Sequence, residues 1–209
     1  IPLFEPLPPQ YFVRAISERW IGCETIVPLP LYELTLPQAT AAHTALLDLR
    51  PLPRSAVGDP KWESIFPFDH FNPIQTQIFH TVYHSDDNVL VGAPTGSGKT
   101  VTAELAVLRL ARAHPGYKAV YIAPLKALVR ERIHDWRAKF VSKLGFSLQE
   151  LTGDVAPDSA ALARADILCT TPEKWDGVSR HWQQRGYVRK VGLVIIDEIH
   201  AIAASKRGD

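Results

Sequence analysis

Short, mostly apolar runs alternate with helix-like segments from about residue 66 to the end of the chain. The candidate strands are residues 88–91, 119–122, 148–151, 167–170 and 193–196. The candidate helices are residues 99–113, 127–144 and 158–165. Continuous apolar strands that are separated by helices are typical of a parallel sheet with helices on both faces. The pattern therefore predicts an α/β domain over residues 66–209.

The first part of the chain has a different pattern. Residues 11–17 alternate between the two faces of a strand, and a second β-like run at residues 20–27 is followed by prolines. This predicts an antiparallel hairpin with proline at its edges. Because two strands cannot bury a core, we expect residues 1–37 to be the end of a larger β-domain. Residues 38–65 are Pro-rich and weakly periodic, which predicts an extended linker.

Composition narrows the class of protein. Hydrophobic residues make up 46% of the chain and charged residues 22%, as in ordinary soluble domains. Since no apolar stretch approaches the roughly 18 residues of a membrane helix, we expect no membrane partner. The two cysteines form no CxxC pair, which suits a reducing compartment and predicts a cytoplasmic or nuclear location. With a net charge of +1, any nucleic-acid binding must depend on local geometry.

A phosphate-binding loop is predicted where the first candidate strand meets the first candidate helix. Gly96 and Gly98 let the backbone curl so that N–H groups point at phosphate oxygens, next to the positive end of the helix. Lys99 would reach the β- and γ-phosphates, and Thr100 would bind Mg²⁺. The alternative is a simple Gly/Ser turn, which the strand–loop–helix context disfavours. The predicted binding residues are Ala93, Pro94, Thr95, Gly96, Ser97, Gly98, Lys99 and Thr100.

An acidic site is predicted at the end of the last candidate strand. Asp197 and Glu198 follow the apolar run at residues 193–196, at the edge where ligands bind in open α/β sheets. Asp197 would hold the metal through water, and Glu198 would act as general base toward the attacking water. His200 would couple the site to a neighbouring domain. The alternative is a strand end with solvated acids, which the pairing with Lys99 disfavours.

These motifs resemble those of superfamily-two helicases. Residues 71–75 look like their Q motif, in which Gln75 would read the adenine edge. Residues 123–128, 152–154 and 171–176 look like the backbone-gripping motifs of the first RecA-like domain in that superfamily. The resemblance is strongest to the superkiller-type branch, whose members carry two tandem helicase cassettes. In that branch an immunoglobulin-like domain ends the first cassette, and a linker leads into the second. Residues 8–53 resemble this junction.

The resemblance implies a fold and an activity. The fold would be an incomplete RecA-like P-loop domain with a parallel sheet, preceded by a β-hairpin remnant of an immunoglobulin-like domain and an extended linker. The activity would be that of an ATP-dependent RNA helicase that uses ATP and Mg²⁺ and moves 3′ to 5′ in a longer protein. Its partners would be RNA or DNA, a second RecA-like domain, the preceding cassette and a multi-subunit complex.

Two alternatives stay open. The cassette could bind nucleotide and serve as a docking platform without hydrolysis, or it could belong to a DNA-acting helicase. Because the chain begins with Ile1 and contains no Met, we expect it to be a piece of a longer polypeptide. Arginine fingers from a second domain raise the turnover rate by a factor of about 10³–10⁵. The 209 residues alone should therefore be nearly inactive.

Nucleic-acid contacts in such a domain go to phosphates and sugars, which position the strand without reading its sequence. The predicted contact residues are Pro124, Lys126, Arg130, Thr152, Gly153, Thr171 and Pro172. Lys126 and Arg130 are one turn apart on a predicted helix, where the alternative is a solvated charged surface. The tryptophans Trp136, Trp175 and Trp182 could stack on bases, but we favour core or interface packing for each.

Overall fold

The computed structural model describes residues 10–30, 44–153 and 157–204, with side chains described as far as Ala201. It divides into two compact units, Ile1–Thr44 and Ala45–Asp209, and each unit is described by itself. Asp154, which the sequence groups with Thr152 and Gly153, lies outside the described residues, as does most of the segment that joins the two units. Among the described helices, none is both long enough and apolar enough to cross a membrane.

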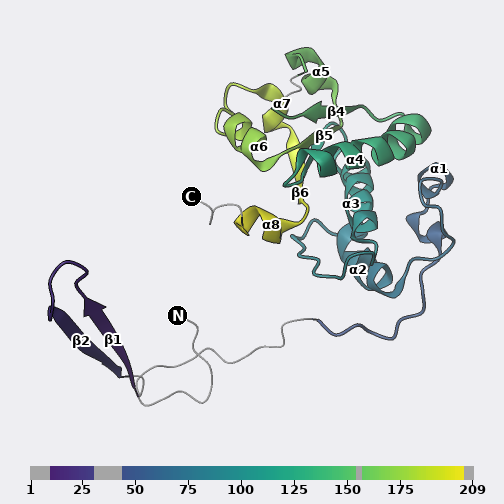
Figure 1. Ribbon diagram of the computed structural model, residues 1–209. Helices are drawn as coiled ribbons and strands as arrows, with labels where there is room; N and C mark the ends of the chain where they lie inside the picture. The colour runs from purple at the N-terminus through teal and green to yellow at the C-terminus, as the bar shows by residue number, and fades with distance from the viewer. Residues whose placement is uncertain (1–9, 31–43, 154–156, 205–209) are drawn as a thin grey trace. The chain divides into compact units, whose positions relative to one another are not determined.

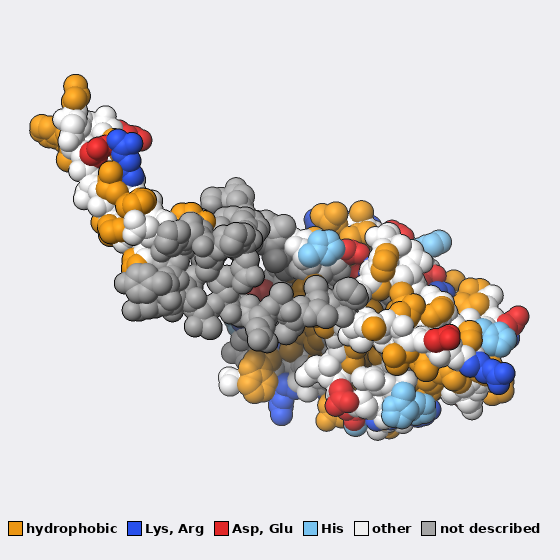
Figure 2. Space-filling view, turned by 90° about the horizontal axis from the view of Figure 1, so that it is seen from below, with side chains coloured by type: hydrophobic (Ala, Val, Ile, Leu, Met, Phe, Trp, Pro, Cys, Tyr) orange, Lys and Arg blue, Asp and Glu red, His pale blue; other side chains and the backbone are white. Residues whose placement is uncertain are grey.

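The described part of the first unit is the predicted antiparallel hairpin. Strand β1 (Gln10–Ile16) pairs with β2 (Glu24–Pro30), with Val13 opposite Val27. The second strand begins later than predicted because residues 18–22 form the turn, which is closed by a 2.9 Å hydrogen bond from Ser17 N to Cys23 O. Every strand residue is exposed, and Figure 2 shows apolar side chains along the hairpin. A larger β-domain around it stays a prediction.

A four-stranded parallel sheet forms the centre of the second unit (Figure 1), as predicted. Its strands, in the order β4-β5-β3-β6, are Leu148–Leu151, Ile167–Thr170, Lys118–Ile122 and Val191–Ile196. Strands β3 and β5 are buried along their whole length, which explains their continuous apolar sequences. All four carboxyl ends meet at one edge of the sheet, so the residues that follow the strands are brought together there.

Helices cover the two faces of this sheet (Figure 1). One face packs against α3 (Lys99–Ala113), α4 (Lys126–Trp136) and a π-helical continuation of α4, η2 (Arg137–Leu144). Helix α2 (Pro73–His84) packs against α3 and belongs to the same hydrophobic cluster. The other face packs against α5 (Ser159–Arg164), α6 (Pro172–Ser179) and α7 (Gly186–Arg189). A short α8 (Ile199–Ala204) follows the acidic motif. The result is a three-layer α/β arrangement.

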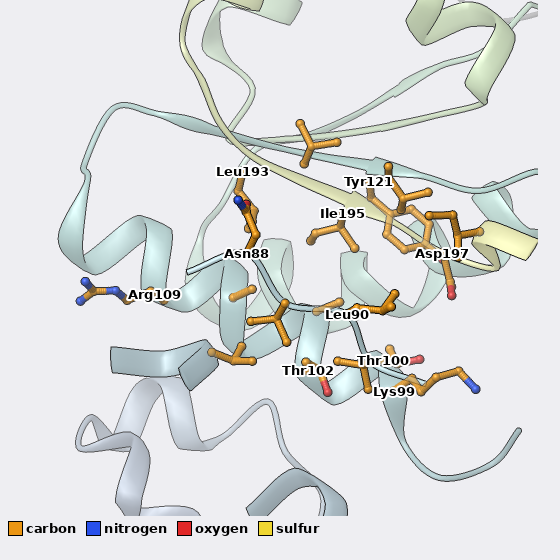
Figure 3. A pocket seen from close by; sticks show the side chains of 18 of the residues that line it. Asn88, Leu90, Lys99, Thr100, Thr102, Arg109, Tyr121, Leu193, Ile195 and Asp197 are labelled. Carbon is orange, nitrogen blue, oxygen red and sulfur yellow. The ribbon is translucent and has the colours of Figure 1, made fainter. Parts of the chain in front are cut away.

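The prediction of a strand at residues 88–91 is wrong. These residues have no regular structure, and Leu90 is 84% exposed. A strand is stable only when a neighbouring strand pairs with its backbone. Here a cleft of about 1040 Å³ separates the segment from β6, and both line it. In Figure 3, Asn88 and Leu90 lie across this cleft from Leu193 and Ile195.

Strand β6 is correspondingly an edge of the sheet. Among the described residues it pairs only with β3. Its residues alternate between partly buried and exposed, and Val194 and Ile196 are each 47% exposed. The continuous apolar run had predicted burial on both faces. The covered face is the one that carries Leu193 and Ile195, which pack against the core.

The segment before α2 packs against the core more closely than an extended linker would. Residues 44–52 have no regular structure, but η1 (Arg54–Val57) and α1 (Pro60–Glu63) follow. Val57, Ile65 and Phe66 are each no more than 2% exposed. Tyr83 of α2 donates a 2.9 Å hydrogen bond to the Val57 carbonyl. Near the start of α2, Phe71 N donates to the Leu52 carbonyl at 2.8 Å. The segment therefore holds both ends of α2, which matters for the site below.

Candidate functional site

The predicted phosphate loop leads directly into α3, which begins at Lys99 as predicted. Gly96 and Gly98 have φ values of 82° and 81°, in the left-handed region that glycine adopts without a steric penalty. No side chain caps the first turn of α3, so its backbone N–H groups face the loop. Together with the positive end of the helix dipole, they make a site for an anion.

Helix α2 braces this loop through two amide side chains. Asn72 caps α2 and donates from Nδ2 to the Ser97 carbonyl at 2.8 Å. Gln75, which is 5% exposed, accepts from Asn72 N at 3.0 Å and donates from Nε2 to the Gly98 carbonyl at 3.3 Å. The structure therefore gives Gln75 a contact with the loop. Its predicted contact with adenine stays a prediction.

The close approach of Gln75 makes Gly98 a sensitive position. A Cβ at Gly98 would lie 2.3 Å from Gln75 Nε2, and alanine is also strained at its positive φ. We expect Gly98→Ala to move the loop at a cost of about 1–2 kcal/mol, which is roughly a 5- to 30-fold loss of nucleotide affinity. A fluorescent nucleotide titration measures it. The control is Gly177→Ala, where the new Cβ meets nothing within 4 Å; equal losses in both variants would contradict the expectation.

Lys99 is held across the top of the loop. Its Nζ donates to the carbonyl of Ala93 at 2.7 Å and to that of Pro94 at 3.1 Å. The buried hydroxyl oxygen of Ser97 has no hydrogen-bond partner in the described structure. A buried polar group without a partner is costly unless something else satisfies it. A phosphate group seated in the loop would satisfy Ser97 and attract the Lys99 ammonium, so these residues fit a triphosphate.

The acidic motif begins where β6 ends. The backbone N–H of Asp197 donates to the Ile122 carbonyl at 2.9 Å, which fixes the carboxylate beside the end of β3. Glu198 has a φ of 49° and is the one non-glycine residue of the described chain with positive φ. Such a conformation costs roughly 1–3 kcal/mol and is concentrated at functional sites. Its N–H donates to Asp197 Oδ1 at 3.0 Å, and its Oε2 lies 3.4 Å from His200 Nε2.

The loop and the acidic motif line one cavity of about 360 Å³. This volume lies within the roughly 300–1,000 Å³ of small-molecule sites. Lys99, Thr100 and Asp197 also line the cleft of about 1040 Å³, and Figure 3 shows them at one end of that cleft. The sequence-predicted residues in this cavity are Thr95, Gly96, Gly98, Lys99, Thr100, Asp197 and Glu198. The arrangement brings a cationic amine, a hydroxyl and two carboxylates to one place.

The oxygen donors in the cavity fit Mg²⁺. Thr100 offers a hydroxyl and Asp197 a carboxylate, the hard ligands that this ion prefers. In the described part of the chain, no three His, Cys, Asp or Glu side chains form a metal-binding group. Mg²⁺ sites at phosphates use one or two protein ligands and otherwise water and phosphate oxygens. Thr100 and Asp197 are therefore enough protein ligands for a magnesium ion that also binds phosphate and water.

Sequence reasoning missed four residues that line this cavity, namely Tyr121, Leu128, Glu131 and Arg132. Tyr121 comes from β3, and the other three come from α4. Tyr121 pairs with Ile195 in the parallel register, so its side chain points to the same face as Asp197, two residues further along. Tyr121 could have been predicted only if β3 had been known to be the strand next to β6.

The predicted nucleic-acid residues follow the other three strands. Pro124 and Lys126 come after β3, Thr152 and Gly153 after β4, and Thr171 and Pro172 after β5. Because these strands are neighbours, the loops share the carboxyl edge of the sheet. The Lys126 ammonium lies 3.7 Å from the position of a Cβ built on Gly153, so these two residues meet. Arg130 Nε lies 3.8 Å from Glu150 Oε1.

Burial limits which groups can face a ligand at this edge. Thr152 is fully buried and donates its hydroxyl to Glu150 Oε1 at 2.9 Å, while Thr171 is 6% exposed. The side chains of Thr152 and Thr171 are therefore closed to a ligand, and Gly153, which is exposed, offers the accessible backbone beside them. Trp136 is buried in the core, as favoured from sequence, whereas Trp182 is 52% exposed.

Nearly the whole chain is similar to known proteins. The family model described as DEAD/DEAH box helicase matches residues 72–209. Activating signal cointegrator 1 complex subunit 3 of Gallus gallus is 61% identical over 202 residues, covering 97% of this chain and 9% of that protein. The Homo sapiens protein of that name is 58% identical over 206 residues, covering 99% of this chain and 9% of that protein.

A plant relative and two solved structures extend the comparison. The DExH-box ATP-dependent RNA helicase DExH14 of Arabidopsis thaliana is 58% identical over 206 residues, covering 99% of this chain and 10% of its own. The chain thus spans about a tenth of the length of these relatives. The DUF1998 helicase MrfA bound to DNA and AMPPNP has a TM-score of 0.63 at 21% identity, covering 72% of this chain and 22% of its own. The DEAD-box helicase Mss116 bound to single-stranded RNA has a TM-score of 0.56 at 20% identity, covering 69% and 32%.

Proposed function

The chain belongs to the DEAD/DEAH box helicase family, and from this premise we propose that it forms the ATP-binding and hydrolysing part of an RNA helicase. The observation that carries the proposal is the shared cavity. The amine of Lys99, the hydroxyl of Thr100 and the carboxylates of Asp197 and Glu198 line the same space of about 360 Å³. A phosphate cradle and an acidic strand end at one cavity support hydrolysis of a triphosphate more than either feature does alone.

The loop residues bind the phosphates. The backbone N–H groups from Gly96 to Thr100 surround the β-phosphate, and Lys99 exchanges the carbonyls of Ala93 and Pro94 for phosphate oxygens. That exchange replaces neutral acceptors with charged ones, and hydrogen bonds to charged groups are roughly twice as strong. Gln75 and Asn72 hold the loop carbonyls, so that the N–H groups stay directed inward. The loop is thereby organised before the nucleotide arrives.

The remaining groups orient the reaction. Thr100 and Asp197 would hold Mg²⁺, which would supply positive charge to offset that of the phosphate groups. Glu198 accepts the proton of the attacking water. The positive φ of Glu198 bends the backbone at the end of β6 and so sets the direction of its carboxylate. His200 Nε2 lies 3.4 Å from Glu198 Oε2 and orients that carboxylate. In the longer protein, arginine fingers from a second RecA-like domain would complete the site.

The substrate is proposed to be single-stranded RNA that is bound along the carboxyl edge of the sheet. The name of the Arabidopsis relative, an ATP-dependent RNA helicase, supports RNA, whereas the DNA-bound MrfA structure keeps DNA as the alternative. The exposed backbone of Gly153 would meet a phosphate, and Lys126, whose ammonium lies beside Gly153, would add charge. The full protein is further proposed to move 3′ to 5′ and, as in the complex-subunit relatives, to work within a multi-subunit assembly.

Hydrolysis and binding by the full-length protein test this function. We expect single-stranded RNA to stimulate ATP hydrolysis more than single-stranded DNA does. Stimulation by DNA alone would favour a DNA-acting helicase, and nucleotide binding without stimulated hydrolysis would favour a docking cassette. The outcome that contradicts the whole proposal is a protein that binds no nucleotide.

Lys126 tests the nucleic-acid edge separately. Removing one phosphate contact from a single strand lowers the slope of log K against log salt by about 0.7. We therefore expect Lys126→Ala to weaken RNA binding several-fold and to reduce this slope by about 0.7, as measured by fluorescence anisotropy at several salt concentrations. The control is Lys61→Ala on α1, which lies away from the carboxyl edge and packs beside η1 and η2. An unchanged slope in Lys126→Ala would remove Lys126 from the interface.

A further inference from the structure

Both oxygens of the Asp197 carboxylate have partners within the protein. Oδ1 accepts the backbone N–H of Glu198 at 3.0 Å. Oδ2 accepts the hydroxyl of Tyr121 at 2.5 Å. The second contact comes from a different strand, because Tyr121 lies on β3 opposite Ile195. A carboxylate that is held at both oxygens has little freedom to rotate, and each oxygen keeps lone pairs for a further ligand.

Tyr121 is itself held in one orientation. It is 2% exposed, and its ring packs edge-on against Trp136 with the centroids 5.2 Å apart. The Arg132 guanidinium lies over the ring, 5.7 Å from its centroid. Because an ionised carboxylate can only accept hydrogen bonds, the Tyr121 hydroxyl is the donor in this contact.

Arg132 also faces the carboxylate side of the pocket. It lines the cavity together with Tyr121 and Asp197, and its side chain is 16% exposed. An arginine guanidinium does not lose its proton in proteins. The guanidinium is thus a fixed positive charge beside the Tyr121–Asp197 pair.

A chain of polar contacts links Arg132 to α3, the helix that follows the phosphate loop. Arg132 Nη1 lies 3.4 Å from Asp135 Oδ2, and Asp135 Oδ2 lies 3.2 Å from Lys139 Nζ. Lys139 Nζ contacts Glu104 Oε1 of α3 at 2.7 Å, and Trp136 donates to the same oxygen at 3.2 Å. Glu104 is fully buried. The network is anchored at the buried Glu104, and its links to α3 and α4 limit the movement of Arg132.

From this geometry we propose that Tyr121, supported by Arg132, is a positioning residue that aims the Asp197 carboxylate at the magnesium of the bound nucleotide. The inference rests on the proposed function, in which Asp197 holds that metal. It adds two residues from β3 and α4 to the site, neither of which carries the metal itself. Partners that orient a metal ligand typically contribute 10- to 100-fold to metal affinity or activity. Helix α4 also carries Lys126, so the element at the nucleic-acid edge contributes directly to the metal site.

Metal binding by full-length protein tests the proposal without relying on activity. Mn²⁺ binding is followed by electron paramagnetic resonance in the presence of a non-hydrolysable ATP analogue. We expect Tyr121→Phe, which keeps the ring that packs on Trp136, to weaken Mn²⁺ binding about 10-fold. Metal-free nucleotide affinity should stay unchanged, and the Mg²⁺ concentration for half-maximal hydrolysis should rise by a similar factor. Unchanged Mn²⁺ binding in Tyr121→Phe overturns the proposal.

Matched variants separate positioning from other roles. Tyr117→Phe makes the same change just before the amino end of β3, where the side chain is 52% exposed, and should bind Mn²⁺ as the wild type does. Arg132→Gln should weaken Mn²⁺ binding in the same direction as Tyr121→Phe. If Arg132→Gln weakens metal-free nucleotide binding instead, Arg132 contacts the nucleotide and its positioning role is wrong. Should Tyr121→Phe fail to fold by circular dichroism, Arg132→Gln decides the outcome by the same Mn²⁺ measurement.

Lys99→Ala in the same series distinguishes this inference from the proposed function. If Lys99→Ala leaves nucleotide affinity and hydrolysis intact, the proposed function fails, and the inference fails with it. If Lys99→Ala abolishes hydrolysis while Tyr121→Phe keeps wild-type metal binding, only the positioning role fails.

Discussion

Lys99→Ala is expected to reduce ATP hydrolysis by the full-length protein by roughly 10²–10³-fold or more. The amine of Lys99 is the one lysine ammonium among the described residues that line the cavity shared with Asp197. Its loss removes the positive charge that meets the β- and γ-phosphates as negative charge develops on them. Steady-state phosphate release with saturating RNA measures the effect.

The matched control for this change is Lys190→Ala. Lys190 is exposed and precedes β6 at the amino end, whereas Asp197 follows β6 at the carboxyl end. Removing its charge should leave hydrolysis at the wild-type rate. Turnover in Lys99→Ala within a factor of two or so of wild type would mean that the triphosphate binds elsewhere.

Glu198→Gln is expected to lower kcat by roughly 10²–10⁴-fold while nucleotide affinity changes little. The amide keeps the size of the side chain but cannot accept the proton of the attacking water. The strained φ of 49° is retained, because both residues are equally disfavoured there. Single-turnover hydrolysis gives the rate, and titration with a fluorescent nucleotide gives the affinity.

Glu131 provides the comparison, because it is the other glutamate that lines the same cavity. Glu131 lies on α4, two positions after the buried Val129, and it is exposed. Glu131→Gln should therefore have a small effect on kcat. A loss in Glu131→Gln equal to that in Glu198→Gln would assign the base to α4.

The features that sequence predicted best are those that a short stretch of chain determines by itself. The start of α3 at Lys99 follows from the glycines and the helix pattern, and strands β4 and β5 have the predicted bounds. Helix α2 was not predicted, although the local signal was present. Asn72 at the N-cap, Pro73 at the first helical position and Gln75 two residues later are a capping box with proline at N1.

Features that depend on distant partners could not be predicted in this way. The strand at residues 88–91 failed because an apolar run pairs only if a neighbouring backbone is available, and β6 lies across a cleft from it. Tyr121 was missed because its contact with Asp197 spans 76 positions of sequence and depends on the β3–β6 register. Gln75 was assigned to adenine from the resemblance to the Q motif, and that role stays a prediction. Its contact with the Gly98 carbonyl was missed because it forms only where α2 packs beside the loop.

The exposed side of β6 has a consequence for solubility. A strand edge with unpaired backbone groups and apolar side chains such as Val194 and Ile196 is a template on which another extended chain can add. Proteins avoid the resulting aggregation by covering or charging such edges, and the exposed side chains of β6 carry no charge. The colloidal behaviour of this domain therefore depends on whatever segment comes to lie against β6, and a preparation that lacks that segment is prone to build intermolecular sheets.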